Sequence, residues 1–371
     1  MREELKLCTA VRRPIKWFTR KRTRADGGYD HPRRFSNAQA EHQRQEKQMT
    51  DLPSIMICGH GSRDKGAVEE FNQLSKRIQE RLPDHKIESG FLEFATPVIR
   101  TGLDKLRDAG AKKIVCLPGM LFAAGHVKND LPSEVNTYAA ENENLDMIFA
   151  ADLGIDARLL DAAKQRVEEA LDGASGTIAR EDTLLLVVGR GTNDSDANSN
   201  VAKVTRMLWE GLGVGWAETA YSGVAYPLVD QALERVTKMG FKRIVVFPYF
   251  LFSGILVTRI YNWADEAGAA NPDVDIVKAS YLNDHPRVID AFIARMEEAL
   301  DGKGVMNCQL CKYREQIIGH EHDQGVVQVG HHHHVQGAGT EDNPEDRGVH
   351  HGHGHHHHHG HGHHHHGEAE G

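Results

Sequence analysis

Three side chains that bind metals or accept protons follow short apolar runs in the first half of the sequence. His60 lies between two glycines in ICGHGSRD (57–64), Glu93 lies in FLEFATP, and His126 lies in FAAGHVKND. Two neutral imidazoles and a carboxylate suit a borderline divalent ion such as Co²⁺, Fe²⁺ or Ni²⁺. The same groups also accept protons near neutral pH. These residue types therefore predict metal or proton chemistry.

Other common chemistries lack their usual motifs in this chain. GHGSRDKG contains neither a phosphate-binding loop with its lysine nor a dinucleotide fingerprint. Ser62 is close to His60 in sequence, but no serine or cysteine is clearly paired with a histidine as a nucleophile. Because these motifs are absent, binding or transfer of a metal ion is the interpretation that fits the three side chains.

The three side chains follow segments that alternate between strand-like and helix-like patterns. Thr96-Pro97 predicts a helix start and Gly110 a helix end. The alternation favours βαβ units and a parallel sheet covered by helices on both faces. His60, Glu93 and His126 would then meet at the carboxyl edge of the sheet, where open α/β sheets bind ligands. The predicted strands are 54–59, 86–93, 113–118 and 146–150, and the predicted helices are 67–82, 97–109, 129–141 and 157–172.

The same pattern recurs at a constant offset of 130 residues. VVGRGTND at 187 matches ICGHGSRD at 57, and FKRIVVFPYFLF at 241 matches AKKIVCLPGMLF at 111. The sequence therefore predicts two tandem, duplicated α/β domains with open parallel sheets, facing each other across a cleft. In the second copy the positions of His60, Glu93 and His126 hold Arg190, Gly223 and Leu256. The joint loss of all three ligands indicates a functional site in the first copy.

Composition limits the class of protein. The chain has 371 residues, 40% of them hydrophobic, and a net charge of -9, which argues against a general nucleic-acid binder. No apolar run is long enough to span a membrane. Five scattered cysteines do not form a disulfide framework and predict a cytoplasmic protein.

The two ends of the chain differ from its body. We expect residues 1–48 to be a basic, disordered leader, 49–178 and 179–302 to be the two domains, and 303–319 to carry an MxCxxC element. Residues 320–371 hold most of the 25 histidines and predict a disordered, metal-binding tail. Glycine interruptions and the trailing GEAEG make a purification tag a poor explanation.

GHGSRD, FLEFATP and PGMLFAAGHVKNDLP resemble motifs of the class II tetrapyrrole chelatases, most closely those of the long, two-domain sirohydrochlorin cobaltochelatases. The resemblance covers about 53–300. It implies insertion of Co²⁺ into sirohydrochlorin during cobalamin biosynthesis. It also implies that His60 and His126 face the macrocycle and deliver metal or remove pyrrole protons, with Glu93 assisting. Arg190 at the matching edge of the second copy would clamp a substrate carboxylate.

Cys308 and Cys311, in MNCQLC, are compatible with a zinc half-site, a redox pair or part of an iron–sulfur cluster. The resemblance favours a 4Fe–4S cluster. Two cysteines do not supply four ligands, however, and Cys58 and Cys116 are expected to be buried in strands.

Two alternatives remain open from sequence. Iron insertion for sirohaem, or nickel insertion, would use the same ligands. In a different class, a metal-storage protein or metallochaperone would act through the tail. The partners expected are sirohydrochlorin and divalent metal ions, without nucleic acid or membrane, in a possible homodimer.

Overall fold

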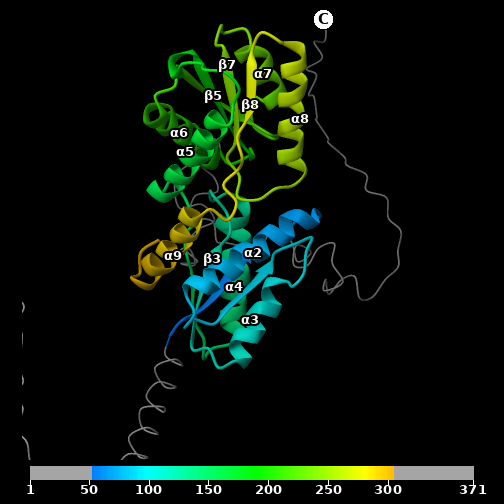
Figure 1. Cartoon of the computed structure of the whole chain (residues 1–371). Helices are drawn as coiled ribbons and strands as arrows, with labels where there is room; N and C mark the ends of the chain where they lie inside the picture. The colour runs from blue at the N-terminus through cyan, green and yellow to red at the C-terminus, as the bar shows by residue number, and fades with distance from the viewer. Residues whose placement is uncertain (1–51, 305–371) are drawn as a thin grey trace, which may run out of the picture. The chain divides into compact units, whose positions relative to one another are not determined.

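The computed structural model describes residues 52–304, which contain two parallel sheets of four strands each (Figure 1). The strand order is β2-β1-β3-β4 in the first sheet and β6-β5-β7-β8 in the second. We call each sheet with the helices that follow its strands the first lobe and the second lobe. The predicted α/β class with two parallel sheets is confirmed. The strands are β1 Ser54–Gly59, β2 Ile87–Phe91, β3 Lys113–Pro118, β4 Asp146–Phe149, β5 Thr183–Gly189, β6 Trp216–Tyr221, β7 Arg243–Pro248 and β8 Asp275–Lys278.

Helices connect the strands and cover both faces of each sheet, which is why the central strands β1 and β5 are apolar after their first residue. All six residues of β1 are buried, as are all seven of β5. The helices are α2 Lys65–Arg81, α3 Ile99–Asp108, α4 Leu131–Glu141, α5 Ala157–Asp172, α6 Ser195–Leu212, α7 Val229–Val236, α8 Ile255–Ala270 and α9 Pro286–Leu300. A π-helical turn, η1 (His126–Asp130), precedes α4, and a short 3₁₀ turn, η2 (Arg180–Asp182), precedes β5.

Helices α5 and α9 cross between the lobes (Figure 1). Helix α5 follows β4 in sequence but packs against β7, β8 and α6 of the second lobe. Helix α9 follows β8 but returns to pack against β3, β4 and α2 of the first lobe. The two crossing helices also pack against each other. Each sheet therefore has one face covered by a helix from the other half of the sequence.

This exchange joins the two lobes through one apolar core. Ile57 and Val115 of the first sheet, Phe292 of α9, and Leu185 and Phe247 of the second sheet are fully buried in a single continuous cluster. The opposite faces of the two sheets have separate clusters beneath α3 and α4 and beneath α7 and α8. Continuous burial of this kind makes the stability of each lobe depend on the other.

The segment before α3 differs from the sequence prediction. Thr96-Pro97 does not begin the helix: α3 starts at Ile99 with Val98 as its N-cap, and the Thr96-Pro97 peptide is cis. The residues after β2 instead fold back on it, because the Phe91 amide donates to the Pro97 carbonyl at 2.9 Å. Gly110, with a φ of 85°, ends the helix region as predicted.

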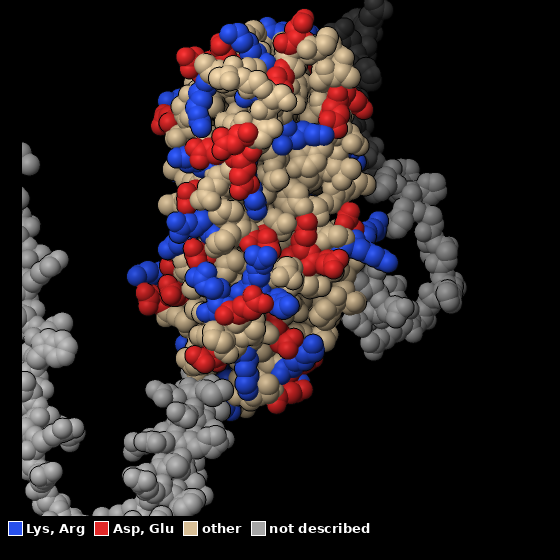
Figure 2. Space-filling model, viewed as in Figure 1, with Lys and Arg blue, Asp and Glu red and all other residues tan. Residues whose placement is uncertain are grey.

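The surface in Figure 2 carries interspersed acidic and basic side chains, without a large area of one sign on that face. No helix within residues 52–304 is long and apolar enough to cross a membrane. The cytoplasmic location and the homodimer stay predictions. The predicted leader, nearly all of the MxCxxC segment and the histidine-rich tail lie outside the described residues.

Candidate active site

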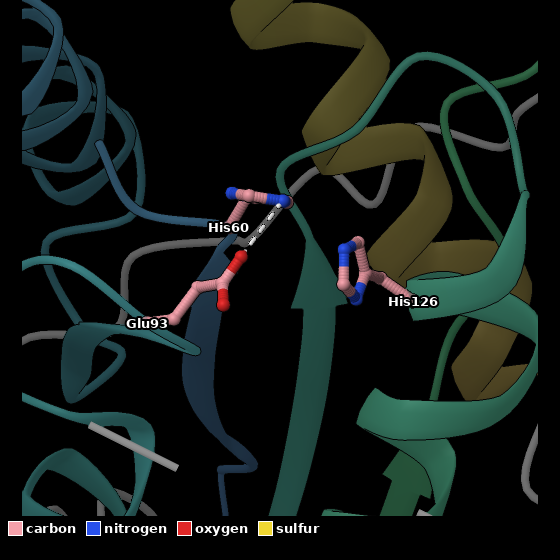
Figure 3. Close-up of side chains that lie close together, drawn as sticks. All are labelled: His60, Glu93 and His126. Carbon is pink, nitrogen blue, oxygen red and sulfur yellow. Dashed lines mark ion pairs between the residues drawn. The ribbon is translucent and has the colours of Figure 1, made fainter. Parts of the chain in front are cut away.

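His60, Glu93 and His126 come together at the carboxyl edge of the first sheet (Figure 3). His60 directly follows β1, Glu93 follows β2, and His126 begins η1 after β3. One potential ligand atom from each lies within 4.8 Å of the others. Ligand atoms that share an ion at about 2.1 Å are roughly 3 to 4 Å apart, so small side-chain rotations would complete a site.

Close packing of two loops sets the position of Glu93 beside His60. The Glu93 amide donates to the His60 carbonyl at 3.0 Å. Gly61 has a φ of 98°, and a Cβ at this position would lie 1.6 Å from the Glu93 carbonyl oxygen. Only glycine fits both that backbone conformation and that contact. Gly61 thus lets the two loops pack closely together.

His60 is held as a neutral imidazole. Burial, followed by the charge of His126, lowers its pKa to about 4, and the nearby Arg190 acts in the same direction. Its Nδ1 lies 3.0 Å from the Gly61 carbonyl oxygen, which only accepts hydrogen bonds, so Nδ1 carries the proton. Nε2 then has a lone pair available for a metal ion.

Glu93 faces that lone pair. Its Oε1 lies 3.3 Å from Nε2 of His60, and the Glu93 side chain is 14% exposed. Burial raises the pKa of Glu93. An ionised carboxylate and an unprotonated nitrogen are both acceptors, so a proton or a cation is needed between them. The pair is therefore suited to hold either one.

Asp130 is a site residue that the sequence analysis missed. Its Oδ2 accepts a hydrogen bond from Nδ1 of His126 at 2.8 Å, and its side chain is 5% exposed. A carboxylate on one ring nitrogen fixes the tautomer that leaves the other nitrogen for a metal. His126 and Asp130 are four residues apart in the π turn, and this spacing in HVKND was the available signal.

The two histidine rings lie edge to face. Their centroids are 4.6 Å apart at an interplanar angle of 81° (Figure 3). Beside them Phe94, which has a φ of 61°, places its ring 6.4 Å from that of His60. The Arg63 guanidinium lies 4.8 Å from the centre of the Phe94 ring. An aromatic ring and a cation thus border the three candidate ligands His60, Glu93 and His126, which we call the metal-binding group.

The second lobe contributes different side chains at its own carboxyl edge. Arg190 follows β5 and donates to the Gly191 carbonyl at 3.4 Å, and its charge acts on both His60 and Glu93. Val224 and Tyr226, on the loop after β6, and Ile255, the first residue of α8, are 61%, 72% and 69% exposed. Such exposed apolar groups mark a surface that contacts another molecule when they gather at one edge.

The two cysteines within residues 52–304 are not placed to bind an iron–sulfur cluster together with Cys308 and Cys311. Cys58 and Cys116 are completely buried in β1 and β3, as the sequence predicted. Cys308 and Cys311 lie outside the described residues. Nothing in the described part of the chain supports a 4Fe–4S cluster, and we do not propose one.

Comparison with known proteins follows the same division into two halves. The CbiX family model matches residues 54–170 and again 184–299. A sirohydrochlorin cobaltochelatase of Priestia megaterium is 34% identical over 72% of this chain and 87% of its own length. A sirohydrochlorin ferrochelatase of the same organism is 25% identical over 71% and 96%. The solved structure of SirB from Bacillus subtilis with Fe³⁺ has a TM-score of 0.61 and 27% identity, covering 68% of this chain and 99% of that one.

Proposed function

The chain belongs to the CbiX family of sirohydrochlorin chelatases, and from this we propose that it inserts Co²⁺ into sirohydrochlorin in cobalamin biosynthesis. The observation that carries the proposal is the group formed by His60, Glu93 and His126. The preference for cobalt is supported by the higher identity to the cobaltochelatase, 34%, than to the ferrochelatase, 25%.

His60 and His126 are assigned as ligands that hold the incoming metal. Nitrogen ligands bind Co²⁺ well, and a site of two imidazoles and one carboxylate leaves positions open for the macrocycle nitrogens. A pKa of about 4 keeps His60 unprotonated at neutral pH, so protons do not compete with the metal there. Because the protein supplies only three ligands in this proposal, the ion can transfer to the four nitrogens of the macrocycle.

Glu93 is assigned as the acceptor of pyrrole protons. Metal insertion replaces two pyrrole N–H protons, so a base must lie within reach of the ring centre. With its pKa lowered to about 4, His60 is a weak proton carrier, whereas the pKa of Glu93 is raised. A proton shared between His60 and Glu93 therefore favours the carboxylate, and His60 stays free for metal.

The second lobe is assigned to holding the substrate. Arg190 offers a guanidinium for one of the macrocycle's carboxylates. The exposed side chains of Val224, Tyr226 and Ile255 offer apolar contact to the ring face. The charge of Arg190 acts on both His60 and Glu93, so this edge lies near the metal-binding group. A macrocycle between the predicted domains would then meet ligands on one side and apolar groups on the other.

Iron insertion is the second candidate. The ferrochelatase relative and the Fe³⁺-bound SirB structure favour it, and the same three ligands would serve. A metal-storage role through the tail concerns residues outside the described part of the chain, and does not explain a ligand group at the sheet edge.

Visible spectroscopy tests the proposal. Sirohydrochlorin is mixed with the full chain and with Co²⁺, Fe²⁺ or Ni²⁺ in parallel, and the rate of the spectral change is compared with that of the metal alone. We expect the greatest acceleration with Co²⁺, and its loss in His60→Ala and His126→Ala. If only Fe²⁺ insertion is accelerated, the substrate metal is iron and the proposal of cobalt insertion is wrong. Near wild-type rates in both variants would remove the assignment of the site.

A further inference from the structure

A lysine of the π turn joins the metal-binding group to the second lobe. Nζ of Lys128 donates to Oδ2 of Asp194 at 2.8 Å and to Oδ2 of Asp196 at 3.0 Å. The side chains of Lys128 and Asp194 are 12% and 4% exposed. Lys128 lies between His126 and Asp130 in a single turn. This ion pair therefore links the turn that carries His126 to residues of the other half of the chain.

Asp194 is a firmly held partner. It is the N-cap of α6, and its Oδ1 accepts hydrogen bonds from the amides of Asp196 and Ala197 at 3.0 and 3.3 Å. Its own amide donates to Thr192 Oγ1 at 3.2 Å. One carboxylate oxygen thus caps the helix while the other binds Lys128. A buried ion pair with fixed geometry is the kind that contributes specificity of structure.

The matching turn of the second lobe lacks this arrangement. At the 130-residue offset Lys128 corresponds to Thr258, whose Oγ1 donates to the Gly254 carbonyl within its own helix. There α8 begins directly at Ile255, without a preceding π turn. Asp64, which corresponds to Asp194, caps α2. Within residues 52–304, the π turn and its ion pair occur together on the side that holds the metal-binding group.

We propose that Lys128 is a positioning residue: through Asp194, the second lobe holds the π turn in the conformation that aims His126 at Glu93 and His60. Asp130 fixes the His126 ring from within the first lobe, and Lys128 fixes the turn from across the lobes. The metal-binding group is then complete only when the two lobes are in contact. This inference rests on the proposed function, because it assigns a role within the same site.

A second contact between the lobes provides the matched control. Glu70 of α2 accepts hydrogen bonds from the Ser253 amide and the Tyr281 hydroxyl, both at 2.6 Å. It joins the same two lobes without touching η1. Because the shared apolar core still holds the lobes together, Glu70→Gln removes a polar contact between them and leaves the turn of His126 intact.

The experiment compares kcat and KM of Lys128→Met, Asp194→Asn, the double variant and Glu70→Gln in the full chain. Asparagine keeps the helix cap. We expect Lys128→Met to lower kcat about 10- to 100-fold, as for groups that orient a metal ligand, with little change in KM for sirohydrochlorin. Asp194→Asn lowers kcat in the same direction. The double variant is no worse than Lys128→Met, because both changes remove one interaction. Glu70→Gln keeps kcat.

A crystal structure of Lys128→Met provides a readout independent of activity. We expect a rearranged π turn and a changed separation of the His60 and His126 rings. An unchanged turn, or a kcat loss in Glu70→Gln as deep as in Lys128→Met, overturns the positioning role. If the wild-type chain inserts no metal, the proposed function fails, and the crystal structure still decides the role of Lys128.

Discussion

Asp130→Asn provides a sharp test of how His126 is prepared for metal. The Asp130 carboxylate accepts two hydrogen bonds, from Nδ1 of His126 at 2.8 Å and from Nδ2 of Asn129 at 2.9 Å. An asparagine side chain has one acceptor oxygen and one donor group. Only one of the two contacts can therefore keep its acceptor, and the other partner faces the amide NH₂ group. If the new amide donates to Nδ1 of His126, the proton moves to Nε2, and that nitrogen no longer binds metal.

The magnitude follows from the interaction that is lost. A hydrogen bond to a charged group contributes about 1.5 to 3 kcal/mol, which corresponds to roughly 10- to 150-fold in rate or affinity. Loss of a carboxylate behind a histidine ligand typically costs 10- to 100-fold. We therefore expect the kcat of Co²⁺ insertion by Asp130→Asn to fall by about 10- to 100-fold. The assay follows the visible spectrum of sirohydrochlorin under saturating Co²⁺.

Asp156→Asn is the matched control. Asp156 is also a buried carboxylate, 7% exposed, but it caps α5 and binds Arg158 and Arg295, which belong to α5 and α9. The Asp156→Asn variant should lose some thermal stability and keep the wild-type kcat per folded molecule. A kcat of Asp130→Asn within about 2-fold of wild type, with the fold intact by circular dichroism, would refute the reasoning about the tautomer of His126.

Three further predictions address other parts of the chain. Arg190→Ala should raise KM for sirohydrochlorin by up to about 10-fold and keep kcat, because an exposed guanidinium contributes at the low end of the range for a charge-assisted pair. Steady-state kinetics check this prediction. A kcat loss as deep as that of His60→Ala would mean that the second lobe is catalytic. Removal of residues 320–371 should leave the maximal rate at saturating Co²⁺ unchanged and lower the number of Co²⁺ ions bound per chain, as measured by equilibrium dialysis; an equal metal count would exclude storage by the tail. Burial raises the pKa of Asp152 from 3.8 to about 6, so the wild-type fold loses stability as pH rises through this window. Asp152→Asn removes that loss, so its unfolding free energy relative to wild type should increase by up to about 3 kcal/mol between pH 4 and pH 7 in urea titrations, whereas a constant difference would contradict the raised pKa.

The sequence was most informative where strands end. The apolar run before Gly59 and the constant offset of the repeat located β1, β3, β5 and β7, because a strand covered on both faces must be apolar throughout. Since parallel strands share a carboxyl edge, placing His60, Glu93 and His126 after successive strands was enough to predict that they meet.

What the sequence did not reveal depends on contacts between distant residues. Thr96-Pro97 has the local pattern of a helix start. The hydrogen bond from the Phe91 amide to the Pro97 carbonyl instead holds this segment against β2, so the helix begins later. The sequence predicted a helix from residue 129, but α4 starts at Leu131, after the π turn His126–Asp130. The π geometry occurs where Lys128 is bound to the second lobe. The crossing of α5 and α9 leaves no mark in apolar periodicity, since a helix presents the same buried stripe to either sheet.

The crossing of α9 has a consequence for synthesis of the chain. The ribosome releases the first sheet long before α9, which covers part of that sheet and spans Pro286–Leu300 at the end of the second lobe. Until then the apolar surface around Val115 is not covered by Phe292, which belongs to the same buried cluster. Contacts between residues this far apart in sequence slow folding and leave incomplete chains prone to aggregate. A nascent chain of this protein therefore reaches its complete core only after nearly all of the described residues have been made.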